Sequence, residues 1–166
     1  MQSYFPEGYT QSVRAAIVVG LVYQCTGYLV TQARHRFFGK EFMNKNFGEE
    51  HRKYFGKDPA VGGYPDNGEG RYSEQLTFGE WHRFSQAVRA YNNFSEWILS
   101  TILSILLCGL FFPTLGGLFG YGIAVGRILY AVGYMINPDK RIVGAAIAEI
   151  LVLINFILIG YGVYKL

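Results

Sequence analysis

Charged residues are scarce in this chain and unevenly distributed. Only 16% of its 166 residues are charged, whereas 51% are hydrophobic and 17% are aromatic. Ten of the 15 lysines and arginines lie between Arg34 and Arg89, and eight of the 12 acidic residues lie between Glu41 and Glu80. The rest of the chain is nearly uncharged, which is unusual for a soluble domain and indicates membrane-spanning segments.

Cysteine and histidine are scarce as well. The two cysteines, Cys25 and Cys108, lie in apolar segments, which favours inert buried thiols and says little about the redox compartment. The three histidines, His35, His51 and His82, share no metal-ligand spacing, so we predict no metal cofactor. The chain also has no nucleophile elbow, P-loop or dinucleotide fingerprint, and we expect no nucleic-acid partner.

Four apolar segments are long enough to cross a membrane. A spanning helix needs about 20 apolar residues, which residues 114–136 and 142–164 satisfy outright. The first segment, 15–31, is short, and the second, 97–112, must extend upstream through polar residues. We therefore predict an all-α, integral-membrane four-helix bundle forming a single domain over residues 1–166. The predicted helices cover approximately residues 11–34, 81–112, 114–136 and 138–165.

A polar segment after the first helix, residues 35–80, is too polar to span and is predicted as an extended loop. Phe38, Phe42 and Met43 have near-helical spacing, which fits either a short interfacial amphipathic helix or an aromatic loop packed on the bundle. The run "DNGEG" lacks the spacing of a calcium-binding loop. Glu49, Glu50 and His51 are interpreted as a solvated charged run.

The number of spans sets the topology. Four spans place both termini on one face of the membrane, and the long loop and "NPDKR" on the other. By the positive-inside rule, this second face is cytosolic, or matrix in a mitochondrial membrane.

Polar side chains form a stripe on each of the two central helices. The stripe on the second helix consists of Arg89, Asn93 and Glu96. The stripe on the third helix consists of Arg127, Tyr130 and Tyr134. Charges at membrane depth are candidates for function by default, and the surplus of arginine favours an anionic guest with several carboxylates. The alternative is an internal ion pair, for example between Glu96 and Arg127.

The start of the fourth helix carries one more arginine. Asn137 is a good N-cap and Pro138 suits the first helical position, so Arg141 is expected on or just after the first turn. There the guanidinium and the positive end of the helix dipole would together favour a thiolate.

Small and polar residues interrupt the last two helices. Asn155 could hydrogen-bond between helices, and Glu149 has no role that the sequence assigns. Two small-xxx-small pairs allow close helix packing, within one chain or between chains: Gly116/Gly120 and Gly122/Gly126.

Two motifs make the sequence resemble a known family. "RAYNNFSEW" resembles the R-A-x-x-N-x-x-E signature of the membrane-associated proteins in eicosanoid and glutathione metabolism (MAPEG). "GRILYAVGYMINPDKR" is similar to the G-R-x-L-Y-A-x-G-Y…K-R segment of the type 3 microsomal glutathione transferase branch. The resemblance covers four spans with a polar loop after the first, although this loop, Arg34 to Arg83, is longer than the family usually has.

The resemblance implies a homotrimer that binds glutathione, as a co-substrate, between neighbouring subunits. It implies Arg141 as the catalytic residue that stabilises the thiolate, and places Trp97 where relatives often have tyrosine. A further arginine near the first helix would line the site, with Arg34 and Arg36 as candidates. The glutathione-binding positions implied by the resemblance are Arg89, Asn93, Glu96, Arg127, Tyr130 and Tyr134.

Three functions fit these features. The first is a membrane-bound glutathione transferase or peroxidase that acts on lipophilic electrophiles, leukotriene precursors included, or on lipid hydroperoxides. The second is a non-catalytic accessory subunit of a larger membrane complex, such as a mitochondrial respiratory complex. The third is a lipid-binding relative that presents fatty acids to another enzyme, against which the retained Arg141 counts. Membrane lipid is an expected partner, and the endoplasmic reticulum is the expected location, with a mitochondrial membrane as the alternative.

Overall fold

The chain is helical throughout its regular structure. The computed structural model describes residues 4–166, and no strand occurs among them, which confirms the all-α prediction. Its elements are α1 (Tyr9–Phe37), α2 (Lys40–Phe55), the 3-10 turn η1 (Ser73–Gln75), α3 (Phe78–Phe111), α4 (Pro113–Ile136), the 3-10 turn η2 (Pro138–Lys140) and α5 (Arg141–Tyr164).

Four of these helices are long and apolar enough to cross a membrane. They are α1, α3, α4 and the continuous stretch Pro138–Tyr164 that contains α5. The shortest, α4, has 24 residues, so at 1.5 Å per residue it is about 36 Å long, which exceeds a hydrocarbon core of about 30 Å. The four-span prediction is therefore confirmed.

α3 begins earlier than the apolar run does, because its first turn is capped. Oε2 of Glu80 accepts hydrogen bonds from the backbone N–H of Thr77 at 3.0 Å and from Thr77 Oγ1 at 2.7 Å. This is a capping box, in which a threonine and a glutamate three residues later satisfy each other's free groups. It fixes the helix start at Phe78.

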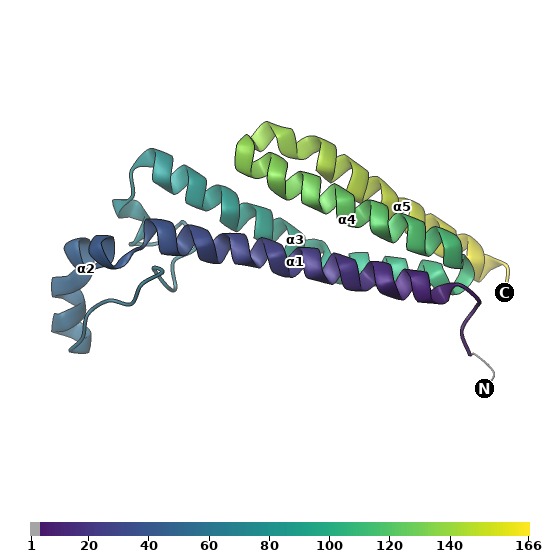
Figure 1. The fold of residues 1–166 in the computed structure, drawn as a ribbon, viewed down its shortest axis with the longest axis horizontal. Coiled ribbons are helices and arrows are strands. Elements are labelled where there is room, and N and C mark those ends of the chain that lie inside the picture. Colours follow the sequence, from purple (N-terminus) through teal and green to yellow (C-terminus); the bar gives the residue numbers. More distant parts are fainter. Residues whose placement is uncertain (1–3) are drawn as a thin grey trace. The chain divides into compact units, whose positions relative to one another are not determined.

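The chain divides into two compact units. The first comprises the residues up to Cys25 together with Asn92–Leu166, and the second comprises Thr26–Tyr91. In the first unit, α1, α3, α4 and α5 all contribute to one core. Within that unit α4 and α5 run side by side, joined by the short turn η2 (Figure 1).

Glycines let the helices of the first unit approach closely. A Cβ on Gly116 would lie 2.7 Å from the backbone nitrogen of Gly109 in α3, and one on Gly126 would lie 2.9 Å from that of Ala148 in α5. A Cβ on Gly144 would collide with the backbone of Tyr130. The glycines of α4 therefore serve packing within the chain, which was one of the two interpretations of their spacing.

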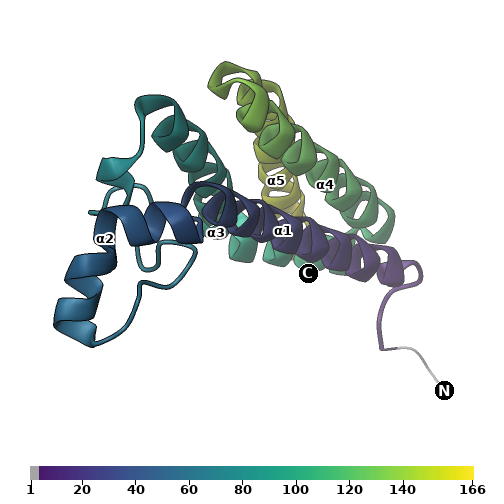
Figure 2. The same ribbon diagram turned by 60° about the vertical axis from the view of Figure 1, so that its left-hand side comes forward.

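The second unit turns the long polar segment into a folded structure. Figure 2 shows α2 and the chain after it, which leads back to the start of α3. The unit has its own apolar core, in which Phe38, Met43, Phe47 and Phe84 are buried. The segment predicted as an extended loop therefore contains a helix, α2, as one of the two interpretations of the aromatic spacing expected, whereas its position at a membrane interface stays a prediction.

Two buried charges hold the loop of the second unit. Arg34 donates from Nη1 to the carbonyl oxygen of Gly62 at 3.0 Å and from Nη2 to Oδ1 of Asn67 at 2.6 Å. Asp66 accepts from the N–H groups of Gly68 at 2.7 Å and Gly70 at 3.1 Å, and more hydrogen bonds come from Ser73. These contacts explain why a glycine-rich segment takes one conformation.

Candidate functional site

The side chain of Arg127 is buried in the first unit. It is 2% exposed, and it is the largest fully buried side chain among residues 4–166. Its Nη1 donates a hydrogen bond to Oδ1 of Asn93 in α3 at 2.9 Å, and its guanidinium carbon lies 4.9 Å from the ring centroid of Phe94. The buried Nε has no hydrogen-bond partner among the described residues. A guanidinium held in this way is a donor that still lacks an acceptor.

Two tyrosines lead from Arg127 toward the end of α4. The ring centroids of Tyr130 and Tyr134 lie 5.7 Å apart, as expected for residues on one helix face. Tyr130 is buried and Tyr134 is half-buried. Within the predicted stripe of the third helix, the side chains of Tyr130 and Tyr134 are therefore neighbours.

Arg141 joins this strip from the start of α5. Its guanidinium carbon lies 5.0 Å from the ring centroid of Tyr134, and its Nη1 donates to the carbonyl oxygen of Pro138 at 2.8 Å. The turn that positions it starts as predicted, because Oδ1 of Asn137 accepts from the N–H of Asp139 at 2.9 Å. The first turn is a 3-10 turn, and Arg141 is the first residue of α5.

The stripe on α3 is only partly drawn into this cluster. Asn93 contacts Arg127, whereas Glu96 is exposed and forms no ion pair within residues 4–166. The suggested ion pair between Glu96 and Arg127 is therefore wrong. Arg89 is exposed as well and belongs to the second unit.

Glu149 is a neighbour of the site that the sequence did not reveal. Although exposed, this residue of α5 is close enough to Arg127 to act on it electrostatically, without forming an ion pair in the described structure. The close contact of Gly126 with Ala148 brings the segments that carry Arg127 and Glu149 together. The glycine pattern was the available signal, but it does not tell which partner helix each glycine faces.

The other polar residue of α5 behaves as expected. Nδ2 of Asn155 donates to Oγ of Ser104 in α3 at 3.3 Å, which confirms a hydrogen bond between helices. Of the two cysteines, Cys108 is buried, whereas Cys25 is exposed, so the prediction of buried thiols is wrong for Cys25.

The two arginines near the end of α1 differ in burial and in hydrogen bonding. Arg34 is buried by its contacts with the loop of the second unit and serves that loop. Arg36 is exposed, with its guanidinium carbon 5.4 Å from the ring centroid of Phe37. Of the two candidates for an additional site-lining arginine, Arg36 is the one that is free of structural hydrogen bonds in residues 4–166.

Four apolar spans and a buried, incompletely paired guanidinium define an integral, multi-pass membrane protein with a polar cluster inside its helix bundle. A model of the MAPEG family matches residues 12–161, so the chain belongs to the MAPEG family. A search of curated proteins found no match.

Proposed function

We propose that this protein is a membrane-bound glutathione transferase, with peroxidase activity toward lipid hydroperoxides as a variant of the same chemistry. MAPEG membership supports a function in glutathione or eicosanoid metabolism. The observation that carries the proposal is Arg127, which is fully buried while its Nε has no acceptor. Leaving a buried charged group short of a hydrogen bond is costly, and a carboxylate of bound glutathione would supply the acceptor.

Arg141 is the proposed catalytic residue. A glutathione sulfur beside its guanidinium and the start of α5 would lose its proton to water more readily, because both favour the thiolate. The thiolate then forms a carbon–sulfur bond with an electrophilic carbon, as the leaving group departs or the adduct takes a proton from water. With a lipid hydroperoxide, it attacks and breaks the O–O bond, so that one oxygen passes to sulfur as a sulfenic acid and the lipid alkoxide takes a proton from water to give the alcohol. A second glutathione then reduces the sulfenic acid, which forms glutathione disulfide and releases water. Electrophiles dissolved in the bilayer would reach this sulfur without crossing water.

The proposed site is completed by further polar residues and by a second copy of the chain. Asn93, Tyr130 and Tyr134 lie with Arg127 and Arg141 in the first unit. Glu96 and Arg89 are exposed on α3, and we propose that they contact glutathione in a homotrimer. Native mass spectrometry in detergent tests the oligomer, and a stable monomer that still binds glutathione would contradict the shared site.

The decisive experiment is a titration of glutathione onto the detergent-purified protein while the ultraviolet absorbance of the thiolate is recorded. The proposal expects saturable thiolate formation at neutral pH, followed by loss of the signal when a lipophilic electrophile is added. Binding without thiolate formation would argue against a transferase, and absence of binding would argue against the site as a whole.

The second unit supports one other function, that of an accessory subunit in a larger membrane complex. It has its own core, and it exposes Tyr54, Tyr64 and Phe78, which are large aromatic side chains suited to an interface. This function predicts that the protein is isolated from its native membrane only in a stoichiometric complex and that it does not turn over glutathione.

A further inference from the structure

A cavity of about 650 Å³ lies within the second unit, and none of the residues proposed to bind glutathione lines it. It is formed by the C-terminal half of α2 and by residues 65–72 of the loop that follows. Cavities of roughly 300–1,000 Å³ are typical of small-molecule sites, so the size suits an organic ligand. Its aromatic lining residues are Phe47, His51, Tyr54, Phe55 and Tyr72.

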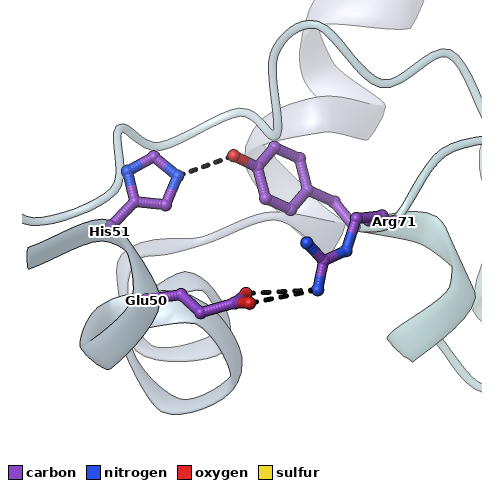
Figure 3. Close-up of polar contacts among 4 residues, drawn as sticks. Glu50, His51 and Arg71 are labelled. Carbon is purple, nitrogen blue, oxygen red and sulfur yellow. Dashed lines mark hydrogen bonds and ion pairs between the residues drawn. The ribbon is translucent and has the colours of Figure 1, made fainter. Parts of the chain in front are cut away.

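The aromatic lining is held by contacts among its own members. His51 Nε2 and the Tyr72 hydroxyl form a hydrogen bond of 2.7 Å, which is the dashed line that starts at His51 in Figure 3. The ring centroids of Phe47 and Tyr72 lie 4.7 Å apart in an edge-to-face arrangement, and those of His51 and Phe55 lie 5.1 Å apart. Phe47, His51 and Tyr72 therefore form a packed aromatic wall, whereas Tyr54 and Phe55 are 70% and 67% exposed and lie on the solvent-exposed side of the cavity.

The charges at the cavity are predominantly negative. The cavity is lined by three carboxylates, those of Glu50, Asp66 and Glu69. Its lining residues include one arginine, Arg71, and no lysine. Nη2 of Arg71 lies 3.2 and 3.3 Å from the two carboxylate oxygens of Glu50 (Figure 3). The carboxylate of Asp66 is used by the loop, whereas Glu69 forms no hydrogen bond or ion pair in the described part of the chain. Glu69 is thus an exposed acid with no compensating cation among the described residues.

We propose that this cavity binds an organic cation with an apolar or aromatic body. The faces of aromatic rings attract ammonium groups, and the carboxylate of Glu69 adds a negative charge beside them. An anion is disfavoured, because it would have to displace Glu50 from Arg71 before it gained a partner of its own. The apolar body would lie against the rings, where its burial from water adds to affinity.

The test uses two probes with one apolar body and opposite charge, 4-phenylbutylamine and 4-phenylbutanoate. The full-length protein in phosphatidylcholine nanodiscs is titrated with each probe by calorimetry, and empty nanodiscs give the uptake by lipid alone. The amine should bind saturably, at one site per chain, while the carboxylate should give no more heat than in empty discs. Equal binding of both probes, or amine uptake equal to that of empty discs, would overturn the proposal.

Charge variants locate the site. Glu69→Gln keeps the side-chain shape and should weaken amine binding about two- to five-fold, the range for exposed charge pairs. Glu49→Gln is the control. Glu49 precedes Glu50 on α2 and is exposed, as Glu69 is, but it does not line the cavity. The double variant Glu50→Gln/Glu69→Gln leaves Arg71 unpaired and should reverse the preference toward 4-phenylbutanoate. If Glu69→Gln binds the amine like Glu49→Gln, or if the double variant keeps the original preference, the proposal is wrong.

Discussion

Nη1 of Arg127 and Oδ1 of Asn93 form a hydrogen bond of 2.9 Å that joins α4 to α3, while the Nε of the same guanidinium has no partner among residues 4–166. Asn93 thus holds one edge of a buried cation and leaves another donor unused. A neutral amide partner does not cancel the positive charge, and Glu149 acts on it without an ion pair. The positive charge is therefore not neutralised by an ion pair among the described residues, and we propose that an anionic ligand neutralises it.

Replacement of this arginine should affect binding before it affects chemistry. Arg127→Ala removes the donors that would hold a carboxylate, so glutathione affinity should fall by at least ten-fold, equivalent to about 1.4 kcal/mol. Arg127→Lys keeps the charge but not the planar set of donors, so it should recover only part of the affinity. Calorimetric titration with glutathione measures both variants. If Arg127→Ala binds glutathione like the parent protein, Arg127 is a structural residue.

The contact between α4 and α5 predicts a stability effect at Gly144. Gly144→Ala places a Cβ against the backbone of Tyr130, which cannot move without separating the helices. We expect a loss of about 1–3 kcal/mol, typical of overpacking, and weaker glutathione binding because Tyr130 shifts. Thermal unfolding in detergent measures the first effect.

Gly160→Ala is the matched control for this substitution. A Cβ at this position on α5 meets nothing within 4 Å, and alanine favours a helix over glycine by about 1 kcal/mol in aqueous hosts. This variant should be as stable as the parent or more so. If the two variants have equal midpoints, the close approach at Gly144 is not a determinant of stability.

The sequence predicted the membrane helices well because hydropathy is a local property. A run such as 142–164 must be buried in lipid or protein whatever the rest of the chain does. The contact between Asn93 and Arg127 could also be anticipated from the sequence. The second and third spanning helices are antiparallel and joined at Pro113, so their ends on the side of the long polar segment lie at similar depth in the membrane. The exposure of Glu96 could not be anticipated, because the spacing of polar residues identifies a helix face but not the neighbour that this face contacts.

The second unit could not be derived in this way. Its fold depends on contacts between residues far apart in sequence, such as Arg34 with Gly62 and Asn67. No periodic pattern encodes those contacts, and each requires a particular loop conformation. Glycines at positive φ, among them Gly68 at 102°, make that conformation accessible.

The loop of the second unit should be sensitive to acid through Asp66. Burial acts to raise the pKa of Asp66, but hydrogen bonds from Ser73, Gly68 and Gly70 outweigh it, so the pKa lies below its ordinary value of 3.8. A carboxyl with a lowered folded-state pKa stabilises the fold above its ordinary pKa and loses this contribution as the pH falls through the folded-state pKa. Asp66→Asn should therefore destabilise the loop at neutral pH by about 1–3 kcal/mol, and it should converge with the parent only as the pH falls through the folded-state pKa, which lies below 3.8.

Trp81 reports on this loop, because its Nε1 donates to the carbonyl oxygen of Gly68 at 2.7 Å. In a Trp97→Phe background it is the remaining tryptophan of the chain, and its emission follows the loop during a urea titration. The control is Asp58→Asn, since Asp58 forms an exposed ion pair with Arg52 at 2.7 Å and such pairs contribute at most about 1 kcal/mol. Equal effects of the two substitutions at neutral pH would refute the role of Asp66.

The topology predicts where proteases can act. Four spans place Arg14 and Lys165 near one face of the membrane and the segment Arg34–Arg83 on the other. In sealed vesicles of one orientation, a protease outside should cleave either that segment or a C-terminal tag, but not both. Cleavage of both from the same side, with the vesicles shown to be intact, would contradict the topology.

The last prediction separates chemistry from binding at Arg141. At the start of α5, its guanidinium carbon lies 5.0 Å from the ring centroid of Tyr134, and we propose that this guanidinium acts on the sulfur of glutathione. Loss of a donor that stabilises charge at the reacting atom costs about 2.7–4 kcal/mol, so Arg141→Ala should lower kcat about 10²–10³-fold while glutathione affinity changes only a few-fold. Lys140→Ala, at the exposed neighbouring cation, should leave kcat near that of the parent. Parental turnover in Arg141→Ala would show that the thiolate is stabilised elsewhere, and a parallel loss of binding and turnover would show that Arg141 holds the turn through Pro138 instead.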